Sequence, residues 1–345
     1  MSGATAHTPT WVIFGAGGFV GSHLSRHLLA LPARRRIILS DLRFSEARMS
    51  PAVREAIASG RLETVIADLR QPIDRNAFPD RVDVIINLAA ICREPDFPPK
   101  DFFEVNVVGG RHVADWATQV DCPQILFTSS IAVYGGDRGR ITESTLPVPF
   151  HAYGSSKLAA EEIFRGWRNG DPQHRSLTIL RPGVIFGPGE NANVHRLIRA
   201  VRRGYFFYCG NRDLPKAGAY VDELCRALTW MQSQEAGKAR LVIANFASPT
   251  PPTLSEYVET IQRVAGWRRW IPSVPYGLLY HAARVFNAIV SLFGISTPIH
   301  PRRVEKLKIA NDVIPQSLVE QGYPFHYTLE EGLRRWREEA PEEWT

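Results

Sequence analysis

The sequence predicts an α/β protein built on a doubly wound parallel sheet. Its first half alternates near-continuous apolar runs of strand length with segments of helical spacing. Strands that are apolar on both faces are typical of a parallel sheet covered by helices on its two sides. After residue 181, prolines and glycines divide the chain into short segments. We therefore expect a smaller, mixed C-terminal domain there.

Seven apolar segments are predicted to be strands of this sheet, at 11–14, 36–41, 62–67, 82–90, 124–128, 176–180 and 241–245. The last of them lies in the part of the chain that prolines and glycines divide, and it is expected to return to the sheet. Helical spacing predicts helices at 22–29, 101–119 and 153–167. The predicted division places 8–181 and about 225–247 in the sheet domain, and 182–224 and 248–345 in the smaller one.

A glycine-rich turn directly follows the first predicted strand. It has the pattern Gly15-x-x-Gly18-x-x-Gly21, and a helical segment comes next. Glycines let the backbone turn tightly and approach a pyrophosphate, whose charge is stabilised at the positive end of the helix. Glycine turns alone are common, because many loops need positive φ angles. The order strand, glycine turn, helix, strand and acid predicts a Rossmann-type dinucleotide site.

The acid in this pattern is Asp41, which ends the second predicted strand about 20 residues after Gly21. Its carboxylate can accept hydrogen bonds from the adenosine ribose and would repel a 2′-phosphate. NAD is therefore the expected cofactor. Arg43 lies two residues further on and could bind that phosphate, so NADP stays open as the alternative.

A second group of residues points to proton transfer. Tyr153 and Lys157 lie four residues apart at the start of a predicted helix and share one face of it. An ammonium near a phenol favours the phenolate, so we expect a lowered pKa for Tyr153. Such a tyrosine can exchange a proton with a substrate hydroxyl while a nicotinamide takes the hydride. Ser130, after the fifth predicted strand, can bind the same oxygen or simply cap a turn.

Together these residues resemble the extended short-chain dehydrogenase/reductase family, specifically its sugar epimerases and dehydratases. The matching segments follow the family's order over nearly the whole chain: Gly15-x-x-Gly18-x-x-Gly21, Asp68-Leu69, Asn87-Leu88-Ala89-Ala90, Asn106, Ser129-Ser130, Tyr153-x-x-x-Lys157 and Arg181-Pro182. The resemblance implies that Tyr153 is the acid/base, that Lys157 holds the nicotinamide ribose and that Ser130 assists. The expected cofactor-binding residues are Gly15, Gly17, Gly18, Phe19, Val20, Gly21, Asp41, Leu42, Arg43, Asp68, Leu69, Leu88, Ala89, Ala90, Asn106, Ser129, Tyr153, Lys157, Pro182 and Val184.

A closer resemblance is to enzymes of surface-polysaccharide pathways that epimerise an N-acetylhexosamine at C4, on UDP or on a polyprenyl diphosphate. The matching segments are 127–135, 149–154, 176–182, 193–194, 219–221 and 327–333. It implies an NAD-dependent C4 epimerase of a diphosphate-linked sugar, with a nucleotide carrier slightly ahead of a polyprenyl one. The expected substrate-binding residues are Arg93, Ser130, Ala132, Val184, Asn193 and Lys216.

Departures from the subgroup keep other reactions open. Cys92 stands where the subgroup usually has a histidine, Val184 where related epimerases have an asparagine, and Lys216 where they have an arginine. A 4-ketoreductase or dehydrogenase acting on a nucleotide sugar or a hydroxysteroid-like substrate is the alternative. The 4,6-dehydratases carry Thr-Asp-Glu near the serine, and Ser129-Ser130-Ile131-Ala132 has no acid, which argues against dehydration. The presence of Tyr153, Lys157 and Ser130 disfavours a non-catalytic NAD sensor.

Composition limits the partners. The 345 residues carry a formal net charge of +6 and are 44% hydrophobic, typical of a soluble globular protein that can bind anions. The basic residues are scattered, and we expect no nucleic-acid binding. Four well-separated cysteines predict free thiols in a reducing compartment and no metal site.

The amino-terminal segment, one apolar segment and two predicted helices bear on location and assembly. The first ten residues are polar, without an apolar signal core, so we expect a cytoplasmic protein. The apolar segment 278–293 has a polar residue at every third or fourth position, which predicts an amphipathic or buried helix that allows peripheral membrane contact. The family resemblance implies a homodimer through the helices at 101–119 and 153–169.

Overall fold

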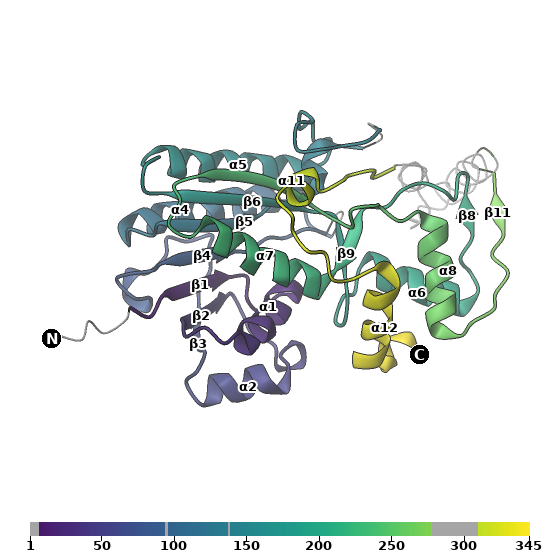
Figure 1. The fold of residues 1–345 in the computed structure, drawn as a ribbon, viewed down its shortest axis with the longest axis horizontal. Helices are drawn as coiled ribbons and strands as arrows, with labels where there is room; N and C mark the ends of the chain where they lie inside the picture. Colours follow the sequence, from purple (N-terminus) through teal and green to yellow (C-terminus); the bar gives the residue numbers. More distant parts are fainter. Residues whose placement is uncertain (1–6, 94–95, 137–138, 276, 278–309) are drawn as a thin grey trace, which may run out of the picture.

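The structure is a computed structural model that describes residues 7–93, 96–136, 139–275, 277 and 310–345 (Figure 1). The helix expected at 278–293 lies outside the described residues. Within the described ranges, no helix is both long enough and apolar enough to cross a membrane.

A seven-stranded parallel sheet forms the larger part of the molecule, in the order β3-β2-β1-β4-β5-β6-β10. The strands are β1 (Thr10–Phe14), β2 (Arg36–Asp41), β3 (Glu63–Ile66), β4 (Val84–Asn87), β5 (Gln124–Thr128), β6 (Ser176–Pro182) and β10 (Leu241–Phe246). The strand order reverses between β1 and β4, which is where such sheets bind ligands. The doubly wound parallel sheet expected from the sequence is confirmed, and so is the return of its last strand.

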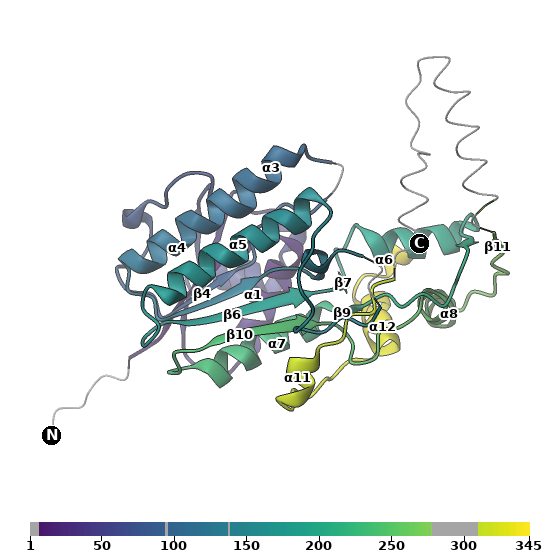
Figure 2. The ribbon, with the colours of Figure 1, turned by 90° about the horizontal axis from the view of Figure 1, so that it is seen from above.

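Alternate residues of β1, an inner strand, explain why both faces of the sheet are covered. Trp11 and Ile13 pack into one core, and Val12 and Phe14 pack into the other. The first core lies under α1 (Phe19–Ala30), α2 (Pro51–Ala58) and α7 (Val221–Glu235), and the second under α4 (Gly109–Gln119) and α5 (Ala152–Asn169). Figure 2 shows α4 and α5 side by side along one face.

The helix expected at 101–119 starts earlier and is not regular. It consists of α3 (Pro99–Phe103), a π-helical turn η3 (Glu104–Val108) and α4. Such turns insert one residue into a helix and are frequent at functional sites. The fourth strand is shorter than expected at both ends, and just after its carboxyl end the Asn87 side chain accepts the Ala89 N–H at 3.1 Å.

A smaller region follows the sheet and has its own core around Phe186, Tyr257 and Trp336. Its helices are α6 (Asn193–Arg203), α8 (Leu254–Ala265) and α12 (Leu329–Glu339), and its parallel strand pairs are β7 (Val184–Phe186) with β9 (Gly218–Tyr220) and β8 (Tyr208–Cys209) with β11 (Ser273–Val274). The remaining elements are η1 (Glu46–Arg48), η2 (Arg75–Ala77), η4 (Ile131–Tyr134), α11 (Gln316–Glu320) and η5 (Pro341–Trp344).

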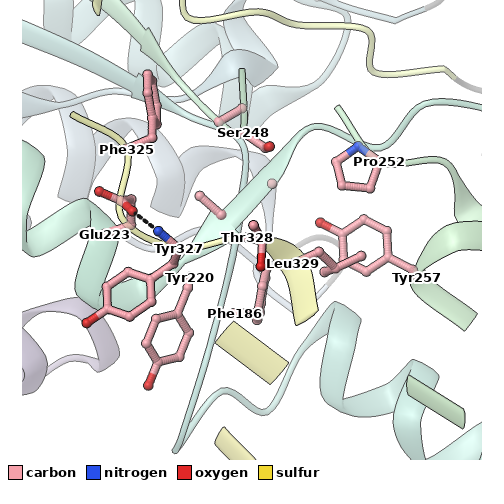
Figure 3. A pocket seen from close by; sticks show the side chains of 13 residues that line it. Phe186, Tyr220, Glu223, Ser248, Pro252, Tyr257, Phe325, Tyr327, Thr328 and Leu329 are labelled. Carbon is pink, nitrogen blue, oxygen red and sulfur yellow. Dashed lines mark hydrogen bonds between the residues drawn. The ribbon is translucent and has the colours of Figure 1, made fainter. Parts of the chain in front are cut away.

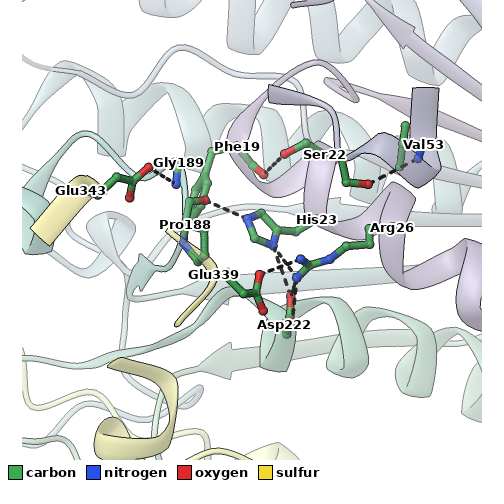
Figure 4. Close-up of polar contacts among 11 residues, drawn as sticks. Phe19, Ser22, His23, Arg26, Val53, Pro188, Gly189, Asp222, Glu339 and Glu343 are labelled. Atoms are coloured by element: carbon green, nitrogen blue, oxygen red, sulfur yellow. Dashed lines mark hydrogen bonds and ion pairs between the residues drawn. The ribbon is translucent and has the colours of Figure 1, made fainter. Parts of the chain in front are cut away.

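A polar cluster fixes the smaller region to the helix that follows the glycine loop (Figure 4). Arg26 of α1 donates to Asp222 at the start of α7 at 2.9 Å and to Glu339 at the end of α12 at 2.7 Å. His23, also on α1, donates from Nε2 to the Pro188 carbonyl at 2.9 Å. The position of α1 is therefore coupled to the 187–189 turn and to the C-terminal helix.

Candidate active site

The glycine loop lies at the carboxyl end of β1, and its shape requires glycine. Gly15 has φ +80°, and a Cβ atom there would lie 2.5 Å from the Ala89 amide nitrogen. A Cβ atom on Gly21 would lie 2.4 Å from the Gly15 carbonyl oxygen. Gly18 caps α1 without a side-chain acceptor, so the amides of the first helical turn are not satisfied by a capping side chain. This arrangement suits the pyrophosphate of a dinucleotide.

Asp41 lies beside this loop, as its spacing predicts. Its carboxylate accepts the Gly17 N–H at 2.9 Å and the Arg43 N–H at 3.4 Å. The neighbouring Leu42 and Arg43 side chains are exposed. The acid is thus held at the mouth of the loop by backbone donors, in the place where the adenosine ribose of a Rossmann-type cofactor lies.

The other expected cofactor residues follow β3 and β4 at the same edge of the sheet. Asp68 accepts the Arg70 guanidinium at 2.6 Å, and this bond lowers the pKa of the Asp68 carboxyl. Leu69 packs against Gly109 of α4. Leu88, Ala89 and Ala90 form the turn that approaches the glycine loop.

Asn106 lies in the π-helical turn, and its side chain ties two segments together. It accepts the Ile91 N–H at 3.0 Å, donates to the Ile91 carbonyl at 3.1 Å and donates to the Ser156 hydroxyl at 2.9 Å. Ser156 in turn donates to the Tyr153 carbonyl at 2.8 Å. These bonds make Asn106 a support for the loop after β4 and for the start of α5.

The three residues expected to carry the chemistry come together at that start. The Tyr153 hydroxyl is hydrogen-bonded to the Ser130 side chain. Lys157 is 1% exposed, and its ammonium lies 4.3 Å from the centroid of the Phe127 ring. Burial lowers the pKa of Lys157 to about 7, and the nearby Glu161 carboxylate opposes this shift.

The pKa of Tyr153 differs from the sequence expectation. We expected Lys157 to lower it, but burial raises the pKa of Tyr153 above its usual value, and Cys92 adds to the increase. The hydrogen bond from Ser130 acts in the opposite direction. The spacing of a tyrosine and a lysine on a helix does not report how deeply the phenol is buried, and here burial has the larger effect.

A buried ion pair behind Lys157 was not foreseen. Glu161 is 0% exposed and lies one turn further along α5. The Arg181 guanidinium binds both of its carboxylate oxygens, at 2.9 and 2.6 Å, and the Ser129 hydroxyl donates to the carboxylate at 2.6 Å. Tyr134 accepts another Arg181 N–H at 2.7 Å. The only sequence signal was the four-residue step from Lys157 to a glutamate on a mostly buried helix.

The expected substrate residues are more dispersed. Ser130 lies at Tyr153, and the carbonyl of Ala132 packs closely on α5. Arg93 donates to Asn191 at 2.7 Å, which bridges the loop after β4 to the loop before α6. Val184 starts β7, Asn193 starts α6, and Lys216 lies in the segment before β9, where burial lowers the pKa of its ammonium. In the described part of the chain, no group of histidine, cysteine, aspartate and glutamate is arranged to hold a metal ion.

A small hollow beside β9, with room for about 10 Å³, contains none of these catalytic candidates (Figure 3). Aromatic side chains line it, among them Phe186, Tyr257 and Tyr327. Glu223 lies at its edge and accepts the backbone N–H groups of His326 and Tyr327, each at 2.7 Å. The Glu223 carboxylate is thus occupied by backbone donors of the C-terminal segment. We interpret the hollow as the packing boundary between this segment, α7 and β9.

The ion pair behind Lys157 predicts the effect of Glu161→Gln. The carboxylate raises the pKa of Lys157, so its removal should lower that pKa further and deprotonate Lys157 at a lower pH. If turnover needs the ammonium, the alkaline limb of the kcat–pH profile should move down by about 1 pH unit or more. Profiles between about pH 5 and 9 measure this.

Glu162→Gln is the matched control, because Glu162 is the exposed neighbour on the same helix. Ser129→Ala removes one hydrogen bond to Glu161 but leaves its charge paired with Arg181, so the limb should stay close to its wild-type position. Thermal unfolding separates these effects from loss of fold, since Glu161→Gln leaves Arg181 without its carboxylate. An alkaline limb that stays in place while kcat falls equally at every pH would contradict the assigned role of Glu161.

Comparison with known proteins agrees with this geometry. The chain is 29% identical over 329 residues to the N-acetyl-α-D-glucosaminyl-diphospho-ditrans,octacis-undecaprenol 4-epimerase of Escherichia coli O157:H7, covering 94% of this chain and 93% of that one. It is 25% identical to isoform 2 of the 3β-hydroxysteroid-dehydrogenase/decarboxylase of Arabidopsis thaliana, covering 97% of this chain and 63% of that one.

Solved structures share the fold. The UDP-glucuronic acid 4-epimerase from Bacillus cereus, in complex with NAD, superimposes with a TM-score of 0.72 at 17% identity, covering 97% of this chain and all of that one. The family model for the NAD-dependent epimerase/dehydratase family matches residues 11–244, which is more than half of the chain. This protein therefore belongs to the NAD-dependent epimerase/dehydratase family, and its cofactor is NAD.

Proposed function

We propose that the protein inverts C4 of a diphosphate-linked sugar, an N-acetylhexosamine, through a transient 4-keto intermediate. The observation that carries this proposal is the hydrogen-bonded pair of Ser130 and Tyr153 above the buried Lys157. These residues can move a proton at a sugar hydroxyl beside a dinucleotide. The relative from E. coli, whose name states a C4 epimerisation of a diphosphate-linked N-acetylglucosaminyl group, supports the choice of reaction.

The residues present fit the cofactor. The uncapped start of α1 and the Gly15–Gly21 loop would hold the pyrophosphate, Asp41 would bind the adenosine ribose, and Lys157 would bind the nicotinamide ribose. NAD, when bound, supplies the acceptor and the donor of the C4 hydride. Only the configuration at C4 of the sugar changes, and each turnover leaves the cofactor in its starting state.

The protein residues move the proton and hold the oxygen. Tyr153 takes the proton of the C4 hydroxyl as the hydride leaves, and returns it to the same oxygen when the hydride comes back to the other face. Ser130 donates a hydrogen bond to that oxygen while its charge develops. The hydrogen bond from Ser130 favours the phenolate of Tyr153 and acts against the effect of burial.

We propose a polyprenyl carrier for the sugar, which reverses the order expected from the sequence. The support is the relative with an undecaprenyl-linked substrate, since the similarity spans nearly the full length of both chains. We assign Lys216, in the segment before β9, and Arg93, in the loop after β4, to the diphosphate, because a dianion that leaves water needs charged partners.

A dehydrogenase acting on a hydroxysteroid-like substrate is the second candidate. The similarity to the plant 3β-hydroxysteroid-dehydrogenase/decarboxylase and the apolar Val184 at the start of β7 favour it. The same Tyr153, Lys157 and Ser130 would serve both reactions. A dehydrogenase would consume one NAD per turnover, whereas an epimerase would not.

The two regions of the chain would divide the binding of cofactor and substrate. Residues 8–181 with about 225–247 would bind NAD, and 182–224 with 248–345 would bind the substrate. A cytoplasmic location is supported by four cysteines that are all free thiols.

We also propose a homodimer formed through α4 and α5, that is, through the segments 101–119 and 153–169. A groove between these helices is lined by the partly exposed Val107 and Ile163, and Phe103 and Val108 nearby are exposed. Light scattering at micromolar concentration should report twice the chain mass of 38.7 kDa, and Ile163→Arg should shift it toward the monomer. A monomeric wild type would exclude the dimer.

Tyr153→Phe is predicted to lower kcat by about 10²-fold or more, because it removes the hydroxyl that transfers the proton. NAD affinity should change little, because the ring is retained. Tyr257→Phe is the matched control: it removes another buried hydroxyl, one without a hydrogen-bond partner, and should leave kcat unchanged. A Tyr153→Phe enzyme with wild-type turnover would refute the acid/base assignment.

Substrate assays test the carrier. UDP-N-acetylglucosamine and polyprenyl-diphospho-N-acetylglucosamine are offered separately without added NADH, and the C4 epimer is quantified. We expect turnover of the lipid-linked sugar at a kcat/KM at least about tenfold above that of the nucleotide sugar. A preference for the nucleotide sugar would reverse the carrier assignment. Turnover of neither, together with NAD reduction by a sterol, would replace the epimerase with the dehydrogenase.

A further inference from the structure

Two segments far apart in the chain lie side by side at the end of the smaller region that carries β8 and β11 (Figure 1). Tyr208 donates its N–H to the Pro272 carbonyl at 2.9 Å, and β8 pairs in parallel with β11. The guanidinium of Arg269 lies 3.2 Å from the point where a Cβ atom on Gly204 would be. Side chains of the segments 203–208 and 268–272 therefore share one surface.

The apolar side chains of these segments divide between core and solvent. Phe206 and Tyr208 pack inward, with ring centroids 5.4 Å apart, while the alternate residues Tyr205 and Phe207 are 59% and 36% exposed. Trp270 is 86% exposed, the largest value among the exposed large hydrophobic residues of the described chain. An indole that stays in water does not gain the free energy of hydrophobic burial. Trp270, Tyr205 and Phe207 are therefore accessible to a partner that could bury them.

The charge around these aromatic residues is positive. The segments 191–212 and 260–275 together contain eight arginines and no aspartate or glutamate. Arg203, Arg268 and Arg269 are exposed beside Tyr205 and Trp270. Acidic groups face the edge of this surface: Glu259 and Asp213 lie near Tyr208, and Glu330 pairs with Arg263.

We propose that this surface docks on the anionic headgroups of a phospholipid bilayer. We call it the Arg–Trp surface, and it consists of Arg203, Tyr205, Phe207, Arg268, Arg269 and Trp270. Tryptophan and tyrosine have an apolar body and a polar tip, which suits the boundary between headgroups and acyl chains. Guanidinium groups bind phosphate oxygens in pairs. The physiological purpose rests on the proposed function, since docking would bring the enzyme to a lipid-linked sugar.

The same chemistry also suits single-stranded nucleic acid, which stacks on aromatic rings along a basic groove. The membrane is favoured because the aromatic residues gather at one end of the molecule and the relative from E. coli is named for a sugar linked to undecaprenol, a long apolar alcohol. Nucleic-acid binding becomes one outcome of the test.

The experiment is co-sedimentation of the full chain with vesicles of phosphatidylcholine alone, or with about 30% phosphatidylglycerol. We expect binding to the anionic vesicles only, weakening as the salt concentration rises because exposed charges are screened. Trp270→Ala and the double variant Arg268→Glu/Arg269→Glu should each weaken this binding at least about tenfold. Arg61→Glu, an exposed arginine between α2 and β3, is the matched control and should bind like the wild type.

Three results would overturn the proposal: wild-type protein that stays in the supernatant with anionic vesicles, variants that bind as the wild type does, or an Arg61→Glu variant that loses binding equally. Binding of a single-stranded oligonucleotide that Trp270→Ala abolishes, without vesicle binding, would assign the surface to nucleic acid instead. Thermal unfolding of each variant confirms that the fold is retained.

Turnover in detergent separates this proposal from the proposed function. With a short-chain polyprenyl-diphospho-N-acetylglucosamine in micelles, Trp270→Ala should keep the wild-type kcat, because the Arg–Trp surface is outside the catalytic residues. Vesicle binding without turnover of any diphosphate-linked sugar would refute the function and leave the docking surface standing. Turnover of the sugar without vesicle binding would refute the docking surface and leave the proposed function standing.

Discussion

The buried pair of Glu161 and Arg181 is the interaction on which the site depends most. It joins α5 to β6, and through Ser129 and Tyr134 it also fixes the segment after β5. Burying two charges is costly unless their hydrogen bonds are satisfied, and breaking such a pair by removing one partner typically costs about 3–5 kcal/mol. Here both carboxylate oxygens accept bonds from the guanidinium. Lys157 lies one turn from Glu161, so the carboxylate that joins α5 to β6 also stabilises the protonated form of Lys157.

A second set of contacts places this helix against the rest of the sheet edge. Asn106, in the π-helical turn, links Ile91 after β4 to Ser156 on α5. Gly15 lets the glycine loop approach the same segment after β4 from the other side. The Arg26 cluster then couples α1 to the smaller region. The cofactor loop, the proton-transferring residues and the region assigned to the substrate are thus joined by direct contacts.

Much of this arrangement could be predicted because it follows from local spacing. The glycine turn, Asp41 and the pair of Tyr153 and Lys157 depend on strand ends and on the helical period, which the sequence displays directly. The ion pair does not follow from local spacing, since Glu161 and Arg181 are 20 residues apart and Tyr134 and Arg181 are 47 apart. Only the folded sheet brings them together.

Other features could not be predicted because they depend on backbone irregularity or on burial. Apolar spacing predicts a regular helix at 101–119, and nothing in it indicates the inserted residue of the π-helical turn. The direction of the Tyr153 pKa shift depends on burial, which residue types alone do not report. Arg93 and Lys216 come from loops whose courses are set by tertiary contacts, and their role toward a diphosphate stays a proposal.

The central claim is that one site removes a hydrogen from C4 and returns the same hydrogen to the opposite face. This can be tested by running the epimerisation of the diphosphate-linked sugar in D₂O and analysing the product by mass spectrometry and NMR. The account predicts a C4 epimer with no deuterium at C4, because the hydride stays with the enzyme while only the hydroxyl proton passes through Tyr153. Deuterium at C4 of the product would show exchange with solvent and would contradict it.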